Sequence, residues 1–183
     1  MRQQDTKSEF SARLLRPKES GGGSAWAFIV LPDEASAKLP RRGRLTVSGA
    51  INGHRFKALL EPDGHKSHWL RIDDDLLQTS RTRIGDDACF EISAVEQEPE
   101  PEVPADLEQA LQAAPESRAT WDATTTIARL DWIHWITSAK QAKTRVKRIN
   151  DACDMLASGK KRVCCFDPSG YYSKAFSSPQ ADE

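Results

Sequence analysis

The feature that most constrains this chain is a stretch of acids and prolines near its middle, Glu96-Gln97-Glu98-Pro99-Glu100-Pro101-Glu102-Val103-Pro104-Ala105. Proline fixes φ and has no backbone N–H to donate, and closely spaced carboxylates repel one another. The stretch also carries too little apolar surface to form a core. We therefore expect an extended linker at residues 96–105, with a separately folded half on each side.

The half before the linker has the alternating pattern of β-strands. Strands are expected at residues 9–15, 26–31, 44–51, 54–60, 65–72 and 88–95, with the apolar run 26–31 as a central strand. Asn52-Gly53, between two alternating runs, is the strongest short hairpin signal because both turn residues must accept positive φ. Short helices are expected at 33–39, capped by Asp33, and at 73–79. About six strands and two short helices predict a small closed or split barrel, because closure removes exposed strand edges.

The half after the linker changes to helical periodicity, so the whole chain is expected to be α+β. Helices are expected at 107–114, capped by Asp106 and ended by Pro115, at 117–123, from Thr124 or Thr125 to Ser138, and up to about Ala157, with Gly159 after the last. The apolar positions of the last helix are Ala142, Val146, Ile149, Cys153 and Leu156. The predicted domains are a small β-barrel at 1–95, the acidic linker at 96–105, a helical segment at 106–163 and a tail at 164–183. The tail is expected to fold back as a short strand or hook, with disordered last residues.

The charge of the chain is unevenly distributed, although the net formal charge is only -1. Residues 96–123 hold eight acids and one base, whereas residues 124–163 hold nine bases and three acids. Either the two regions neutralise each other within the fold, or the basic region forms a surface for an anionic partner.

The candidate ligand-binding residues lie at the beginning of the last predicted helix. Lys140, Thr144 and Arg148 are spaced by four residues and are expected near one face, with Arg145 pointing in a different direction. These side chains can bind phosphates or carboxylates, for which arginine offers a planar pair of donors. The alternative is that Arg145 and Arg148 pair with acids of the barrel or linker and fix the helix in place.

The sequence carries no recognisable catalytic motif, metal-ligand spacing or cofactor loop, so we predict no catalytic residue, no metal and no cofactor. Histidines 54, 65 and 68 are expected to be scattered, although His54 and His68 could share one face. The four cysteines lack a C-x-x-C pair, which favours reduced thiols and a cytoplasmic location. Cys164 and Cys165 follow three bases, which favour a lower thiol pKa and hence redox sensitivity. No secretory signal or membrane-spanning run is visible.

Residues 105–165 resemble a known family. Trp135-Ile136, Ala139-Lys140, Thr144-Arg145 and Arg148-Ile149 follow the W-I-x-x-A-K-x-x-x-T-R-x-x-R-I signature of the YdeI/OmpD-associated family, also labelled bacteriocin-protection. Lys143 departs from it, since relatives often carry glutamate there.

The N-terminal half resembles the small β domain that often precedes this segment. The residues that carry this resemblance are Trp26 with Leu31-Pro32, Arg42-Gly43, Ile51-Asn52-Gly53 and Ile84-Gly85-Asp86. The resemblance implies a double-split β-barrel and a bacterial protein with a role in bacteriocin or stress tolerance.

The leading functional hypothesis is a bacterial cytoplasmic binding protein whose basic helical surface contacts an anionic ligand, nucleic acid or protein. The alternative is an enzyme with a site between barrel and helices that uses His54, His68, Arg145 or Cys164. A third possibility is a homodimer in which the helical segment embraces a partner barrel, so both a monomer and a homodimer remain open.

Overall fold

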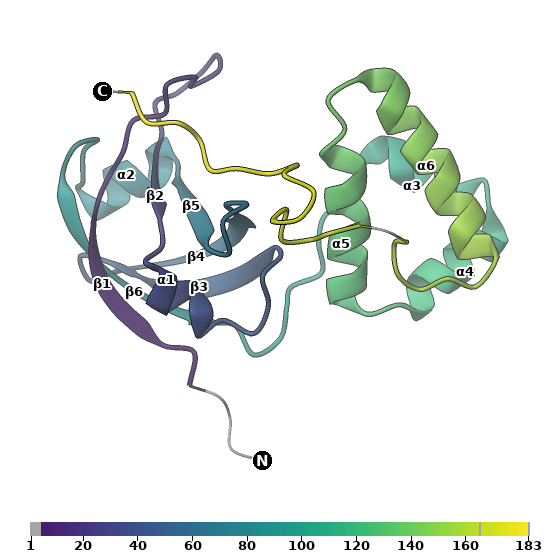
Figure 1. Cartoon of the computed structure of the whole chain (residues 1–183), viewed down its shortest axis with the longest axis horizontal. Helices are drawn as coiled ribbons and strands as arrows, with labels where there is room; N and C mark the ends of the chain where they lie inside the picture. Colours follow the sequence, from purple (N-terminus) through teal and green to yellow (C-terminus); the bar gives the residue numbers. More distant parts are fainter. Residues whose placement is uncertain (1–4, 165, 183) are drawn as a thin grey trace. The chain divides into compact units, whose positions relative to one another are not determined.

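A computed structural model describes residues 5–164 and 166–182 (Figure 1). The chain divides into two compact units. The first contains residues 1–97 together with 169–183, and the second contains residues 98–168. The chain therefore leaves the first unit, forms the second, and returns to the first.

The first unit is a six-stranded antiparallel barrel that is nearly closed. Its strands follow the order β1-β6-β3-β4-β5-β2, with bounds β1 (Ser8–Arg13), β2 (Ala27–Val30), β3 (Leu45–Ile51), β4 (His54–Pro62), β5 (His68–Ile72) and β6 (Asp87–Ala94). The two ends of this order meet at one bridge, where Leu15 and Phe28 exchange backbone hydrogen bonds of 2.9 and 3.0 Å. The predicted α+β fold with a six-stranded barrel is confirmed.

The barrel encloses an aliphatic core supplied by alternate residues of its strands. The largest buried side chains of this core include Leu14, Ile29, Ile51, Leu60, Leu70, Ile72 and Ile92. The predicted hairpin is present, and its turn residues Asn52 and Gly53 have φ of 48° and 81°. This geometry matches the right-handed twist of the two strands it joins.

Two strand predictions need correction. The run at 26–31 forms β2, which lies at the end of the strand order and is not central. It is apolar because both faces are covered: Ile29 faces the core, whereas Phe28 contacts the rings of Trp26 and Trp69. The strand expected from residue 65 begins at His68, because residues 63–67 form a tight turn.

Two short helices lie in this unit, α1 (Asp33–Ala37) and α2 (Asp74–Ser80). Asp73 caps α2, accepting a hydrogen bond of 2.9 Å from the backbone amide of Leu76. The prediction that Asp33 caps the first helix is wrong. Pro32 occupies the cap position, and Asp33 is the first helical residue, where its charge favours the positive end of the helix.

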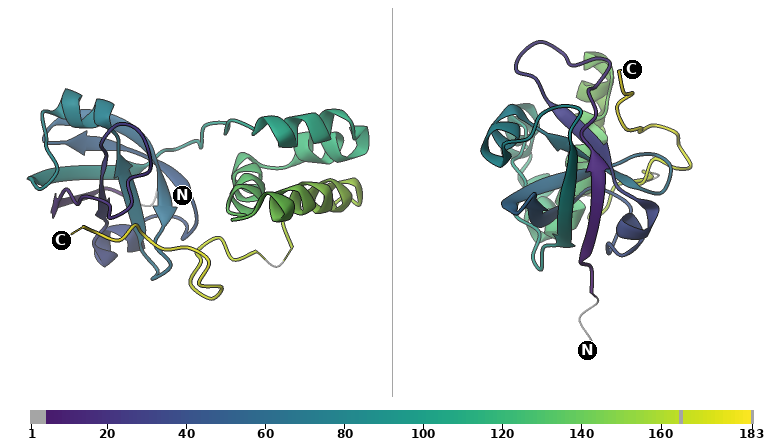
Figure 2. Two further views of the ribbon diagram at one scale, coloured as in Figure 1. Left: turned by 90° about the horizontal axis from the view of Figure 1, so that it is seen from above. Right: turned by 90° about the vertical axis from the view of Figure 1, so that its left-hand side faces the viewer.

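The second unit consists of four helices that pack against one another (Figure 2). They are α3 (Ala105–Gln112), α4 (Pro115–Ala123), α5 (Thr126–Thr137) and α6 (Ala142–Ala157). Their shared core includes Leu107, Leu111, Trp121, Trp132 and Ile136. Within the described residues, no helix is both long and apolar enough to cross a membrane.

The helix boundaries follow the predicted caps in part. Thr125 caps α5 by accepting from the amide of Ala128. Pro115, which is expected to end α3, is the first residue of α4. At that position its missing N–H costs nothing, because the first amides of a helix have no intrahelical acceptor. The prediction that Asp106 caps α3 is wrong. Pro104 occupies the cap position, and Asp106 lies in the first turn of the helix. On α6, Val146 is 60% exposed, so it does not belong to the buried stripe that its spacing predicts.

The segments between and after the helices are ordered by specific contacts. Glu100 in the acidic stretch binds Arg129 of α5 through hydrogen bonds of 2.7 and 2.8 Å. The end of the tail pairs with the segment that follows β1 through backbone hydrogen bonds. The amide of Lys18 donates to the Gln180 carbonyl, and the amide of Asp182 donates to the Arg16 carbonyl. The tail thus folds back as predicted, and the expected disorder does not extend to residues 180–182.

Candidate functional site

The candidate residues lie around the first turns of α6. This helix begins at Ala142, after Gln141, whose side chain makes no capping hydrogen bond. Lys140 is exposed in the turn before the helix, so helical spacing does not place it on the face of Thr144 and Arg148. Thr144 is half-buried in the first turn. No acidic residue lies in that turn.

Arg145 joins α6 to α3. Its Nε and Nη2 donate to the two carboxylate oxygens of Asp106 at 2.7 and 3.1 Å. These hydrogen bonds to the guanidinium hold the pKa of the Asp106 carboxyl below its usual value. They also raise the pKa of Arg145. Both side chains are one third to one half exposed, so the pair acts as an orienting contact more than as a large source of stability.

Arg148 joins α6 to the end of α5. Its Nη1 donates to the backbone carbonyl of Trp135 at 2.6 Å and to the Ser138 hydroxyl at 3.2 Å. The guanidinium carbon lies 5.6 Å from the centre of the Trp135 ring, within cation–π distance. Carbonyls in the last turn of a helix lack an intrahelical partner. At the end of α5, the Trp135 carbonyl thus accepts from Arg148 and also from the Ser138 hydroxyl, at 3.0 Å.

These contacts explain the orientation of α6. Arg145 and Arg148 are turned toward α3 and α5 at the beginning of the helix, and Ile149, Ala152 and Leu156 continue that side into the core. Val146 then faces away from the neighbouring helices. The structural alternative predicts that both arginines pair with acids of the barrel or linker. Arg145 instead pairs with Asp106 of α3, and Arg148 contacts a carbonyl and a hydroxyl.

The lysines just before α6 and in its first turns are exposed to solvent. Lys140 and Lys143 are exposed. Among the described residues, no acid forms an ion pair with either of them. Lys147 pairs with Asp151 one turn along the helix at 2.7 Å.

Sequence reasoning does not identify Asp106 or Ser138 as partners of the arginines. Asp106 lies just beyond the acidic stretch, and the sequence does not distinguish its carboxylate from those of the nearby acids.

The histidines named for an enzymatic alternative do not come together in the first unit. His54 is exposed at the start of β4, where it pairs in register with Ile51. His68 is fully buried beside the other end of β4, opposite Pro62. No group of three or more metal-ligating side chains occurs in the described part of the chain.

His68 has a structural environment. Its Nδ1 lies 2.7 Å from the Ser36 hydroxyl, and its Nε2 lies 3.0 Å from the Gly43 carbonyl. Burial lowers the pKa of this imidazole, so a neutral ring that donates from Nε2 and accepts at Nδ1 fits both partners. His68 thereby connects β5 to α1 and to the loop before β3.

The cysteines occupy separate environments. Cys89 and Cys164 are exposed thiols, and Cys153 is a half-buried thiol on α6. Burial raises the pKa of the Cys153 thiol, which disfavours a reactive thiolate. Cys165 lies outside the described residues.

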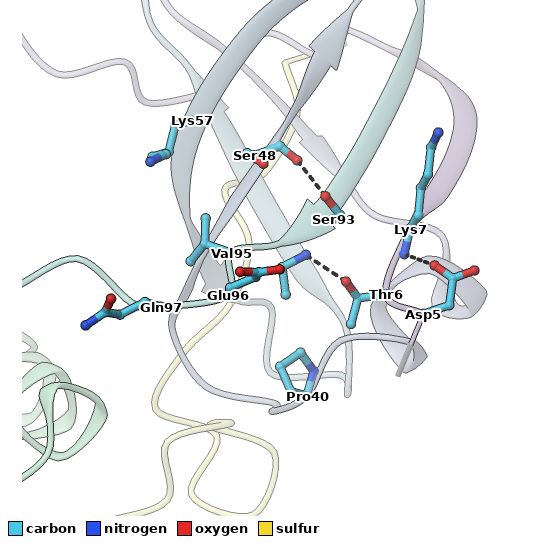
Figure 3. A pocket seen from close by; sticks show the side chains of 11 residues that line it. Asp5, Thr6, Lys7, Pro40, Ser48, Lys57, Ser93, Val95, Glu96 and Gln97 are labelled. Carbon is cyan, nitrogen blue, oxygen red and sulfur yellow. Dashed lines mark hydrogen bonds between the residues drawn. The ribbon is translucent and has the colours of Figure 1, made fainter. Parts of the chain in front are cut away.

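A cavity of about 910 Å³ lies on the outer face of the barrel (Figure 3). Ser48 and Ser93 are paired in register and form part of its lining. Lys57 and Glu96 also line it, so its charge is mixed. Thr6 is engaged internally, because its hydroxyl accepts from the amide of Ala94 at 3.0 Å. The mixed lining selects no single class of ligand.

Comparison with known proteins identifies both units. Residues 100–159 match the family described as Bacteriocin-protection, YdeI or OmpD-Associated. Residues 10–92 match a domain of unknown function, DUF1905. Among curated proteins there is no significant match. The order of the two matches is the order predicted from the motifs. The helical segment at residues 100–159 thus matches the YdeI/OmpD-associated, bacteriocin-protection family, and the DUF1905 match at residues 10–92 precedes it.

Proposed function

We propose that this protein is a cytoplasmic, non-catalytic binding protein that contributes to bacteriocin tolerance, and that the start of α6 binds an anionic group of its partner. The observation that carries the proposal is the uncapped beginning of α6, flanked by the exposed Lys140 and Lys143. The match of residues 100–159 to a bacteriocin-protection family supports the biological role.

The physical basis is the combination of helix geometry and charge. The first backbone amides of a helix have no intrahelical acceptor, and the aligned peptide dipoles favour an anion at that end. Gln141 leaves these donors without a side-chain cap, and the first turn holds no carboxylate to occupy them. A phosphate or carboxylate can accept from these amides and from the Thr144 hydroxyl while Lys140 and Lys143 balance its charge.

Arg145 and Arg148 have a positioning role in this proposal. Their hydrogen bonds to Asp106 and to the Trp135 carbonyl fix the first turns of α6 against α3 and α5. The backbone amides then keep one orientation before the ligand arrives, which reduces the entropic cost of binding. The exposed part of Arg145 can add a contact to the same anion.

The test is a titration of the full-length protein with inorganic phosphate, followed by backbone amide NMR shifts. Saturable shifts centred on residues 142–145 are expected. A Lys140→Ala, Lys143→Ala variant should weaken this binding severalfold. The matched control is Lys160→Ala, Lys161→Ala, which removes the same charge from two exposed residues beyond the other end of α6. Equal weakening by the control pair, or no shift at 142–145, would refute the site.

A further inference from the structure

A separate basic surface lies in the barrel unit, and we name it the tyrosine patch. Its residues are Arg42, His65, Lys66, Tyr171, Tyr172 and Lys174. They come from the loop before β3, the turn between β4 and β5, and the returning tail. Arg42 donates a hydrogen bond to the Lys66 carbonyl. The Lys66 ammonium lies 4.5 Å from the centre of the Tyr171 ring. That ring meets Tyr172 edge-on, with centroids 5.1 Å apart.

The patch combines exposed aromatic rings with cations. Tyr172 is 83% exposed and Tyr171 is 39% exposed. Arg42, Lys66 and Lys174 are exposed beside them. The three segments, residues 40–43, 63–67 and 169–176, contain a single acid, Asp63. That carboxylate is buried and accepts from the backbone amides of His65 and Ser67 at 2.7 and 2.8 Å. The exposed charge of the patch is therefore positive.

The rings are held on an ordered turn. The amide of Lys174 donates to the Gly170 carbonyl at 2.9 Å and closes the turn that carries both tyrosines. Phe176 then lies so close to Gly64 and Gly170 that a Cβ at either glycine would collide with it. This contact fastens the turn to the loop between β4 and β5.

Two residues of the patch have a strained backbone. Lys66 and Lys174 have φ of 70° and 55°, and they are two of the four non-glycine residues with positive φ in the described part of the chain. Such conformations cost free energy, persist only where the surroundings fix them, and gather at functional sites. Both lysines here flank the exposed tyrosines.

We propose that the tyrosine patch binds single-stranded nucleic acid. Tyr172 stacks on an unpaired base, while Arg42, Lys66 and Lys174 contact the flanking phosphates. Proteins that bind single strands combine cations along the backbone with exposed aromatic rings that stack on bases. A polyanion without bases would contact the cations but would leave the tyrosine rings unused. The bases of a duplex are already stacked on one another and are not available to the rings. Single-stranded nucleic acid is the polyanion that uses both. The inference goes beyond the proposed function and concerns the other unit.

The experiment measures binding of the full-length protein to a fluorescent oligothymidylate of about 12 nucleotides, at low salt, by anisotropy. The variant Tyr171→Ala, Tyr172→Ala should weaken binding about tenfold or more. Phenylalanine at both positions should restore it, because the ring is retained. Lys66→Asn with Lys174→Asn removes two charges while placing a residue that tolerates positive φ. That pair should lower the slope of log affinity against log salt concentration by about 1 to 2.

The controls separate this inference from the α6 proposal and from general charge effects. Lys160→Ala, Lys161→Ala and Lys140→Ala, Lys143→Ala should each leave oligonucleotide affinity within about twofold, since stacking is local. Circular dichroism establishes that the tyrosine variant is folded. Absence of binding by the wild type at low salt would overturn the inference. So would unchanged affinity in the alanine variant, equal affinity for duplex DNA, or displacement by inorganic polyphosphate as effective as by the oligonucleotide.

Discussion

At the scale of single residues, three cationic or titratable side chains join neighbouring elements of this protein. Arg148 completes the end of α5, Arg145 links α6 to α3, and His68 links β5 to α1 and to the loop before β3. The sequence alone shows that arginine can donate hydrogen bonds and that histidine can donate, accept and change its protonation state. What each one contacts depends on partners at least ten residues distant in the chain, which neither composition nor spacing specifies.

The arginines are expected to differ in their contributions to stability. Arg148→Ala leaves a helix-terminal carbonyl without its charged donor and should lower the free energy of unfolding by about 2 kcal/mol. Arg145→Ala breaks a half-exposed ion pair and should cost about 0.5 kcal/mol. Urea denaturation measures both. The Arg145 effect should shrink in about 1 M salt, because screening weakens exposed pairs. A larger loss of unfolding free energy from Arg145→Ala than from Arg148→Ala would contradict the larger structural role given to Arg148.

His68 should make stability depend on pH. Burial lowers the pKa of the folded imidazole below its ordinary value of 6.5. As pH falls below about 6.5, the unfolded chain therefore takes up a proton that the folded chain excludes. Stability is complete above this pH and declines below it, until pH reaches the folded pKa. Urea denaturation between about pH 5 and 8 measures the slope.

The matched variants for this prediction are His68→Phe and His54→Ala. His68→Phe abolishes the titration and leaves the Ser36 hydroxyl and the Gly43 carbonyl without their partner, so it should cost about 1 to 3 kcal/mol at neutral pH. Its stability should then vary less with pH than that of the wild type. His54 is exposed, and His54→Ala should keep the wild-type slope. A His68→Phe protein with an unchanged slope would show that other groups cause the decline.

At the scale of elements, the sequence identifies those whose signals are local. The Asn52-Gly53 hairpin, the short helix predicted at 73–79 and the glycine after α6 each depend on local residues, and all three are present. Errors occur where tertiary contacts decide the outcome. Val146 follows the apolar spacing of α6, yet Arg145 and Arg148 occupy the inward side at that level. Lys140 shares a spacing of four with Thr144, but the helix begins only after it.

The end of α6 gives a prediction at this scale. Gly159 has φ of 89°, and the amide of Lys160 donates to the Met155 carbonyl across the helix end. Nothing lies within 4 Å of the place a Cβ would take at Gly159, so a substitution is penalised by backbone conformation alone. Gly159→Ala should cost about 1 to 2 kcal/mol. Thermal denaturation measures the loss.

Gly22→Ala is the control for this effect. Gly22 is also exposed, and a Cβ there would likewise meet no atom within 4 Å, but its φ is not in the left-handed region. The change should stay within about 0.5 kcal/mol of the wild type. Equal costs at Gly22 and Gly159 would mean that the helix end is not held by the left-handed glycine.

At the scale of the whole molecule, the path of the chain is the feature that sequence reasoning misses. The acidic stretch is recognisable as a boundary, but the sequence predicts the return of residues 169–182 to the barrel unit only as a hook of unknown destination. The bridge between Pro17 and Ala181 joins residues more than 160 positions apart. Neither segment has a strong strand pattern, because a single bridge with backbone hydrogen bonds needs no apolar alternation.

This path makes the helical unit a segment inserted between the barrel and its own C-terminal segment, and it predicts that the insert folds alone. The core of residues 98–168 is built from its own side chains, including two buried tryptophans, Trp121 and Trp132. The ion pairs Glu100–Arg129 and Asp106–Arg145 are also internal to it. The isolated fragment should therefore be helical and unfold cooperatively with heat, as followed by circular dichroism and tryptophan fluorescence.

The arginine variants test whether the fragment has the structure it has in the full chain. Arg148→Ala should destabilise the fragment by the same amount as the full-length protein, because Trp135 and Ser138 belong to the same unit. Additivity of this kind is expected when a substitution and a truncation share no partners. A fragment that is helical but melts without a transition, or that is insensitive to Arg148→Ala, would show that the barrel unit is needed to fix the packing of α5 against α6.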